Sequence, residues 1–470
     1  MLFGWPGFLE DKTLVTSYII AATAMLATVF YLFLQLRAYL STTYMLVVAL
    51  LLIYGPASLI YTLTLGRPHF LISWLIFGVI NDPHDIFVRI RSRLPDFDAV
   101  VISMNFSLAL MYAGVIAGIE TVNRLAPIRA TKEALALSNW NSQPLRDEDS
   151  TRRLLLTAIL ILALFMLYVS ISEKHLSIIT HFFSIKDNDD RDLFRMNFAG
   201  SQSYTYRVVL SALAPMFVIW GFLAGATRRS WGLLAAAALL LACTLIGKIE
   251  SLSKAPPAFF ILQLMLGALL LLTNRVSIWL LTIGGLAVFG FIYLVTRLII
   301  VFPEGIFPLL WLHTRLFEVS NQTVLEYFAA FPHMHPYLWG ANIRPIAALL
   351  GVPYTPSFTT VADIWFGEPG ITNPALFIAD GWADFSYVGV IVYSIIVGAL
   401  CRAIDLTFLA NGKSAVAVAV LGASVWGLLT LLTTALNIAL FTGGLLLAPA
   451  LAAMLTLSGR ILAGKDLRTA

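Results

Sequence analysis

Residues 331–345, FPHMHPYLWGANIRP, belong to a long polar interruption in an otherwise apolar chain, which runs from Phe302 to Asp384. The interruption also holds WLHTRLFEVSNQ (311–322) and FGEPGITNPALFIADGWADF (366–385). No apolar run within it reaches the about 20 residues that a helix needs to cross a bilayer. Its many aromatic residues are untypical of disordered segments. We therefore expect a folded element outside the bilayer that caps a membrane domain, with the chemistry beneath it.

The composition of the chain is that of a membrane protein. Of its 470 residues, 59% are hydrophobic and 12% are charged, and the mean hydropathy is +0.86. Soluble domains carry about 25% charged residues. The two cysteines, Cys243 and Cys401, lie in or beside apolar runs and form neither a disulfide framework nor a metal-binding pattern. We expect an all-α protein that crosses the membrane many times.

Apolar runs predict eleven transmembrane helices in three regions. Residues 1–301 hold the first eight spans, residues 302–384 form the large loop, and residues 385–470 hold the last three spans and a tail. The twelve-residue run HFLISWLIFGVI (69–80) is short for a span, and a crossing there makes twelve spans and moves the N-terminus to the other side. The predicted spans are 14–36, 44–65, 99–118, 153–172, 207–226, 231–247, 258–273, 276–301, 385–400, 415–436 and 438–459.

Short basic loops set the predicted orientation. TRRS (227–230), Arg275 and the tail with Arg460, Lys465 and Arg468 all fall on one side of the predicted membrane. Because cytoplasmic loops carry an excess of Lys and Arg, this side is predicted to be cytoplasmic, including the C-terminus. The loop 302–384 then lies on the opposite face, which we expect to carry the active site.

Basic residues also gather on the face that topology alone does not require to be basic. An Arg or Lys at a membrane face suits a diphosphate, because guanidinium grips phosphate oxygens in pairs and ammonium adds a point charge. The alternative is that each residue anchors the interface or pairs with a loop acid. The candidate diphosphate-binding residues are Arg191, Arg195, Arg207, Lys254, Arg297, Arg315 and Arg344.

Four residues of the long loop are candidate general bases. His333 and His335 lie two residues apart between prolines, and imidazole titrates near neutrality. Asp380 and Asp384 lie where the chain returns to the membrane, where they can also act as helix N-terminal caps. The two histidines lack a third ligand at metal-site spacing, so no metal is predicted.

A second acidic site is possible near the first outer segment. Asp82 and Asp85 occur in INDPHDIFVRIRSR (80–93) and suit the acidic site of lipid-linked sugar transferases, unless they only form local ion pairs. The chain contains no P-loop, dinucleotide fingerprint, zinc spacing or nucleophile elbow. Nothing points to a cofactor or to nucleic acid, which leaves chemistry on a substrate that is already activated.

The loop region resembles the O-antigen polymerase and ligase superfamily over about residues 190–470. Thr372 stands where the ligase branch often has a His, and the re-entry step lacks its first Gly, which favours the polymerase side. The residues that carry the resemblance are Arg315, Phe331-Pro332, Trp339-Gly340, Asn373-Pro374-Ala375-Leu376-Phe377 and Asp384-Phe385-Ser386-Tyr387-Val388-Gly389.

The resemblance implies a membrane glycosyltransferase with a GT-C-like helical core and a large periplasmic loop in a bacterial inner membrane. It would polymerise oligosaccharide repeat units, moving a growing glycan from polyprenyl diphosphate to the non-reducing end of an acceptor for an O-antigen, capsule or exopolysaccharide. Trp339, Asn373 and Trp382 would bind glycan, and a chain-length regulator is a candidate partner. The sugar and the inverting or retaining outcome stay open.

Three other functions remain open. The first is a GT-C transferase that adds single sugars from a lipid-phosphate donor around Asp82 and Asp85. The second is a flippase or exporter of lipid-linked glycans, although such transporters tend to show internal repeats and none stands out. The third is a scaffold in a polysaccharide assembly complex, which would tolerate neutralisation of the basic residues.

Overall fold

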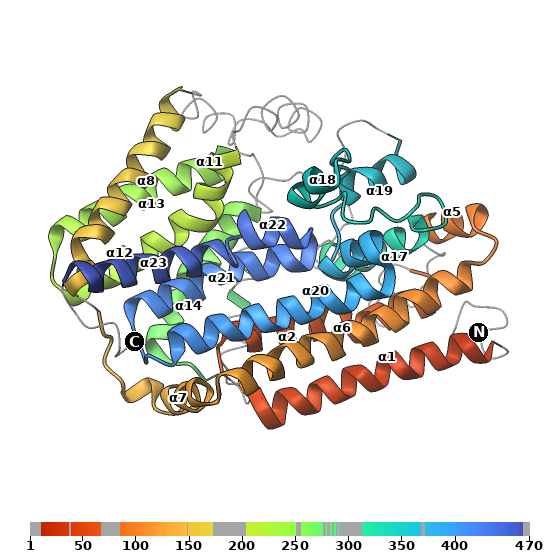
Figure 1. Cartoon of the computed structure of the whole chain (residues 1–470), viewed down its shortest axis with the longest axis horizontal. Coiled ribbons are helices and arrows are strands. Elements are labelled where there is room, and N and C mark those ends of the chain that lie inside the picture. Colours follow the sequence, from red (N-terminus) through yellow and green to blue (C-terminus); the bar gives the residue numbers. More distant parts are fainter. Residues whose placement is uncertain are drawn as a thin grey trace.

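The described part of the chain is helical throughout, as a computed structural model shows (Figure 1). No β-strand occurs among the residues that it describes, and two isolated bridges join loops. The structure describes residues 11–36, 39–66, 85–147, 149–172, 204–250, 255–275, 279, 283, 286–287, 290, 313–367 and 372–463.

The helices follow one another with short connections, and short π- or 3-10-helical turns are labelled η. Before residue 280 they are α1 (Lys12–Tyr31), η1 (Leu32–Leu36), α2 (Thr42–Tyr54), α3 (Pro56–Leu63), α5 (Asp85–Arg93), α6 (Phe97–Leu125), α7 (Pro127–Ser138), η3 (Trp140–Ser142), η4 (Asp149–Thr151), α8 (Arg152–Ser172), α11 (Tyr204–Val208), η5 (Val209–Leu213), α12 (Ala214–Thr227), α13 (Trp231–Glu250) and α14 (Ala255–Leu272). After residue 312 they are η6 (Thr314–Glu318), α17 (Val319–Ala330), α18 (Arg344–Leu350), α19 (Ser357–Trp365), α20 (Phe377–Leu409), α21 (Ala415–Thr433), α22 (Leu436–Phe441) and α23 (Leu447–Leu462).

Eight helical stretches among the described residues are long and apolar enough to cross a membrane, so the chain is a polytopic helical membrane protein. Each coincides with or contains one predicted span. Two further predicted spans match shorter apolar helices, Phe259–Leu272 and Leu447–Leu462. The predicted span 276–301 and the run 69–80 lie largely or wholly outside the described residues. The eight stretches are Lys12–Gln35, Thr42–Leu63, Phe97–Leu125, Arg152–Ser172, Tyr204–Thr227, Trp231–Lys248, Phe377–Leu409 and Ala415–Thr433.

Helices α6 and α20 form the central pair of the bundle, because small residues let their backbones approach closely. A Cβ atom added at Gly114 would lie 2.7 Å from Ser394 Cβ, and one added at Gly118 would lie 2.8 Å from the Ala399 amide and closer still to the Ile395 carbonyl. The spacing of four residues between the two glycines puts them on one face of α6.

Replacing Gly118 with Ala is therefore expected to destabilise the fold. The added methyl meets backbone atoms of α20, which cannot move aside as a flexible side chain can, and overpacking of this kind costs about 1–3 kcal/mol. Gly232→Ala is the matched control, because a Cβ atom there meets nothing within 4 Å. Thermal unfolding of both variants in one detergent tests this, and equal midpoints for Gly118→Ala and the parent would contradict the packing argument.

Helix α20 is two helices joined at a sharp kink. Phe385 and Ser386 have non-helical backbone angles, and Ser386 has a φ of 55°. The Tyr393 hydroxyl donates a hydrogen bond to Asp384 Oδ2 at 2.8 Å, although nine residues of straight helix rise about 13.5 Å. The chain therefore folds back at the kink, and Gly381 packs directly against the backbone of Gly389.

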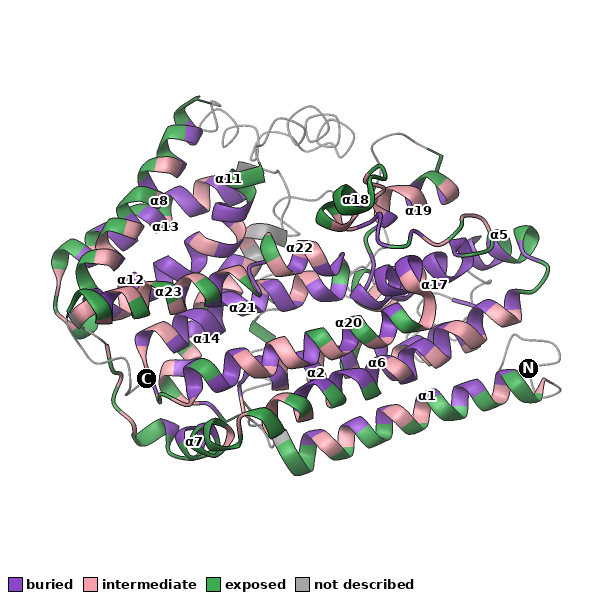
Figure 2. Cartoon of the chain, in the orientation of Figure 1, coloured by how far each residue is buried: buried purple, intermediate pink, exposed green. Residues whose placement is uncertain are grey.

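Helix α17 lies inside the bundle and not above it. It packs against α6, α20, α3, α5 and α19, and all side chains from Thr323 to Ala330 are buried (Figure 2). The predicted cap is thus helical in its described part, but its first long helix belongs to the core. We call the end of the bundle where α6 and α20 begin the α17 end, and the end where they finish the α7 end.

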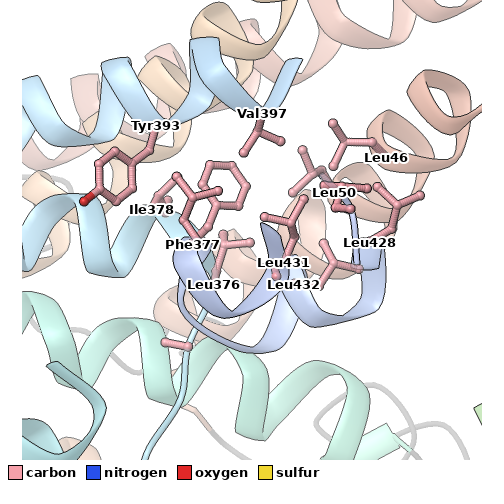
Figure 3. Close-up of a cluster of buried hydrophobic side chains, with 14 of the residues drawn as sticks. Leu46, Leu50, Leu376, Phe377, Ile378, Tyr393, Val397, Leu428, Leu431 and Leu432 are labelled. Carbon is pink, nitrogen blue, oxygen red and sulfur yellow. The ribbon is translucent and has the colours of Figure 1, made fainter. Parts of the chain in front are cut away.

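An apolar cluster underlies the α17 end. Figure 3 shows side chains of α2, α20 and α21 in contact around the start of α20, with the Tyr393 hydroxyl pointing away from them. Leu46 and Leu50 of α2, Phe377 of α20 and Leu428 of α21 belong to this cluster. The polar groups described next therefore lie on a packed apolar base.

Candidate functional site

Two buried carboxyl groups lie on the first half of α20, immediately before the kink. Asn342 Nδ2 donates to Asp380 Oδ1 (3.4 Å) and to Asp384 Oδ2 (3.5 Å), so one amide joins the two. Ser357 donates from its hydroxyl to Asp380, and its peptide N–H donates to Asn342 Oδ1 at 2.9 Å. Together with Tyr393, these groups tie the 342–357 segment to both halves of α20.

The acidic pair is held by neutral donors. Among the described residues, neither Asp380 nor Asp384 forms an ion pair, and Asp380 Oδ2 and Asp384 Oδ1 have no hydrogen-bond partner. Both side chains are almost completely buried. Because an unsatisfied buried acceptor costs free energy, the pair is an expensive feature of the fold. Its burial makes it a holder of the surrounding segment and not a base that a substrate can reach directly.

Trp339 is an exposed aromatic residue held in a rigid position. Its side chain is 63% exposed, and its backbone lies in the left-handed region with a φ of 49°. Its N–H donates to the Asp384 carbonyl at 3.1 Å, and its ring contacts Tyr337 and Phe385 edge-on at centroid distances of 6.1 Å. A bulky residue in this backbone region is strained, and such strain concentrates at functional sites.

Trp382 occupies the interior beneath Trp339. It stacks on Phe328 at 4.6 Å between ring centroids and meets Tyr337 and Tyr387 edge-on at 5.8 and 5.0 Å. Its indole N–H donates to the Phe331 carbonyl at 2.9 Å. The structure therefore places this predicted glycan-binding residue in the core, where it supports the 331–344 segment.

The two predicted histidines differ in their surroundings. His333 is exposed, whereas His335 is half-buried and lies edge-on against Phe331 at 5.5 Å. Nδ1 of His335 lies 2.7 Å from the Pro336 carbonyl oxygen. Because a carbonyl oxygen only accepts, Nδ1 carries the hydrogen, and a neutral ring then has its lone pair on Nε2. His335 is therefore the better-prepared base of the two.

Arg344 begins α18 close to the acidic pair. Its guanidinium lies over the ring of Tyr354, 4.8 Å from the centroid, and its side chain is exposed. Burial raises the pKa of the Tyr354 phenol, while the charge of Arg344 lowers it and that of Asp380 raises it. One phenol thus feels both charges, so Arg344 lies within electrostatic reach of Asp380.

Asn373 belongs to a separate buried cluster on the other side of α17. Its side-chain amide donates to Glu326, whose second carboxylate oxygen accepts from Gln322 at 2.8 Å. Burial raises the pKa of Glu326 above its ordinary value. Asn373 is therefore occupied in holding a buried acid. An acid within the apolar run TVLEYFAAF (323–331) was the available signal for Glu326.

The remaining predicted residues are not brought to this segment. Arg207 is exposed on α11, and Arg315 is exposed in η6, separated from residue 331 by the whole of α17. The described residues contain no group of three or more His, Cys, Asp or Glu side chains arranged to hold a metal ion. Predicted residues outside the described ranges are Arg191, Arg195, Lys254, Arg297 and Asp82, and only the backbone of Asp85 is described.

A second buried charge cluster lies at the α7 end. Arg402 forms an ion pair with Glu133 (Nη1–Oε2, 2.5 Å) and donates from Nε to Asn123 Oδ1 at 2.6 Å. Burial raises the pKa of Glu133 to about 8, with the charge of Asp405 acting in the same direction and Arg402 opposing it. Within the described chain, Glu133 Oε1 has no hydrogen-bond partner.

Asp405 closes this cluster by capping another helix. Its carboxylate accepts from the peptide N–H groups of Thr42 (2.9 Å) and Thr43 (3.0 Å) at the start of α2. Negative charge at a helix N-terminus is favourable. Sequence analysis missed this cluster, because Arg402, Asp405 and Glu133 each look like ordinary residues at the end of a span.

Comparison with known proteins leaves this geometry as the basis for assigning a function: no protein-family model matches the chain, and no curated protein or solved structure matches it significantly.

Proposed function

We propose that the chain is a membrane glycosyltransferase that polymerises lipid-linked oligosaccharide repeat units at the α17 end of the bundle. The observation that carries this proposal is the 331–344 segment. It presents the half-buried His335, the exposed Trp339 and the exposed Arg344, and it is held in place by α20. A base, an aromatic platform and a cation at one end of a membrane bundle suit a substrate that combines a sugar with a lipid diphosphate.

The proposed reaction needs no cofactor, because the donor is already activated. Nε2 of His335 takes the proton of the acceptor hydroxyl, whose oxygen then bonds to the anomeric carbon of the donor glycan. The bond from that carbon to the diphosphate oxygen breaks, and the electron pair leaves with the polyprenyl diphosphate. Arg344 stabilises the charge that develops on the diphosphate, and Trp339 offers a stacking face to a sugar.

Several finer features belong to the proposal. They are the eleven-span count, the GT-C-like core, the bacterial inner membrane and a periplasmic α17 end. Arg191, Arg195, Arg207, Lys254, Arg297 and Arg315 are proposed as further contacts to the diphosphate. Their support is the resemblance to O-antigen polymerases and the chemistry of their side chains.

A flippase for lipid-linked glycans is the second candidate, favoured by broken helices. The kink at Phe385 and Ser386 interrupts α20, and the chain between α22 and α23 turns at Gly443 and Gly444. Discontinuous helices are frequent in transporters. A flippase moves the repeat unit without lengthening it, so the two functions give different products.

The test uses His335→Gln with His333→Gln as its matched control, in a strain that depends on this protein for its surface glycan. We expect His335→Gln to lower the rate of chain extension about 10²–10⁴-fold, since this is the usual contribution of a general base. His333→Gln should extend chains at nearly the parental rate. Trp339→Ala should raise the substrate concentration needed for half-maximal rate. Lipid-linked glycans separated on a gel, after membrane levels have been matched, give the readout.

The position of the accumulated repeat unit separates the two candidate functions. Single repeat units on the α17 face of the membrane in the His335→Gln strain support a polymerase. Single units retained on the α7 face indicate a flippase. Normal ladders from His335→Gln and Trp339→Ala would remove the basis of the polymerase proposal.

A further inference from the structure

Helix α7 is fixed to the bundle by one face. Glu133, Ala136 and Leu137 are buried, and Glu133 forms its ion pair with Arg402 at 2.5 Å. The side-chain amide of Asn274 donates to the Leu137 carbonyl at 2.6 Å. The orientation of the helix about its own axis is therefore set, and so is the identity of the face that it turns outward.

The outward face of α7 carries large apolar side chains. Ile128 is 73% exposed and Leu135 is 63% exposed, and their spacing of seven residues puts them on the same side of the helix (Figure 2). Leu125, at the end of α6, is 80% exposed and extends this surface. The apolar residues are thus gathered at the junction of a membrane-spanning helix and the helix that follows it.

The charge of the exposed surface is entirely basic. Lys132 and Arg129 are exposed on α7, and Arg124 is exposed at the end of α6. The single acid of α7 is Glu133, and it points inward to Arg402. The exposed surface therefore offers apolar and cationic groups, with no carboxylate from α7 to oppose them.

We propose that α7 lies in the interfacial layer of the membrane, where Leu125, Ile128 and Leu135 enter the acyl boundary and Arg124, Arg129 and Lys132 bind anionic lipid headgroups. Continuity with the span Phe97–Leu125 places α7 at the level where acyl chains meet headgroups. An amphipathic helix with large apolar residues and Lys or Arg takes this position, and the basic side chains reach the phosphates. A soluble partner would have to cover a surface that the bilayer already borders. This inference does not depend on the proposed enzymatic function.

The test places a fluorescent label on α7 in reconstituted vesicles. Cys243 and Cys401 are both buried, so the unsubstituted chain serves as the labelling blank. Ile128→Cys and Leu135→Cys carry an environment-sensitive label, with Asn411→Cys, which is exposed in the loop after α20, as the control. Vesicles contain phosphatidylcholine alone or with phosphatidylglycerol, together with a lipid-borne quencher or aqueous iodide.

We expect the lipid-borne quencher to act several-fold more strongly at positions 128 and 135 than at 411. Phosphatidylglycerol should increase this quenching, and Arg129→Gln with Lys132→Gln should remove the increase. Iodide quenching at 128 and 135 equal to that at 411 would overturn the proposal. Labels shielded from both quenchers would also overturn it, because they would show that protein covers this face. Equal lipid quenching with and without phosphatidylglycerol would overturn the headgroup-binding part.

Discussion

Replacing Arg402 with Gln lowers the free energy of unfolding by about 3–5 kcal/mol, which is the usual cost of removing one partner from a buried ion pair. The substitution leaves Glu133 facing the charge of Asp405 without a compensating cation. It also removes the donor to Asn123. Unfolding titrated with sodium dodecyl sulfate in mixed micelles gives the free energy, and a loss below about 1 kcal/mol, the level of an exposed pair, contradicts the buried-cluster interpretation.

Glu133→Gln is the matched variant, and it also tests a dependence on pH. The pKa of Glu133 is raised in the folded state to about 8 from an ordinary value of 4.5. Between these values the folded chain keeps a proton that the unfolded chain has released, so stability falls as pH rises through this window. The slope from one such group approaches about 1.4 kcal/mol per pH unit. Glu133→Gln should flatten the profile, and an unchanged slope would show that Glu133 does not titrate there.

Replacing Asp384 with Ala lowers turnover by about 100-fold or more without touching a group that contacts substrate. The loss leaves the Tyr393 hydroxyl and the Asn342 amide without the acceptor that they share. Unsatisfied buried donors cost about 1–3 kcal/mol each, so the 331–344 segment shifts to relieve them. A displacement of about 1 Å at His335 and Trp339 is enough for this loss of rate.

Two conservative variants show whether Asp384 acts by positioning. Tyr393→Phe removes one hydrogen bond, worth about 0.5–1.5 kcal/mol, and should change turnover only slightly. Asp384→Asn keeps the shape and one acceptor and should fall between the two. Hydrogen exchange of residues 331–344 provides a readout apart from activity. Parental exchange and parental turnover in Asp384→Ala would contradict the positioning role.

The membrane spans were the predictable part of the fold, because length and hydropathy decide them. Eight predicted spans match described helices that can cross a bilayer. The kink of α20 was not predicted, because no Pro marks Phe385 or Ser386. It depends on the contact between Gly381 and Gly389, which only the folded chain makes. Helix α17 was read as part of a loop, because Asn321, Gln322 and Glu326 make it too polar for a span.

Residue type alone could nominate the site but could not sort its members. Trp339 and Trp382 are the same residue with opposite environments, one exposed and one buried. His333 and His335 lie two residues apart, and only His335 has Nδ1 held by a carbonyl group. Asn342 was missed because one Asn in a loop has no local signal, and its role comes from two acids about 40 residues away.

The buried position of α17 sets an order for biosynthesis. This helix of 12 residues is too short to cross a bilayer and carries Asn321 and the buried acid Glu326. Half of its packing surface is supplied by α20, which the ribosome makes later. Segment 319–330 must therefore wait outside the lipid until α20 has been inserted, and only then enter the bundle. A chain released before α20 is complete exposes this segment, which makes it a natural recognition signal for membrane quality control.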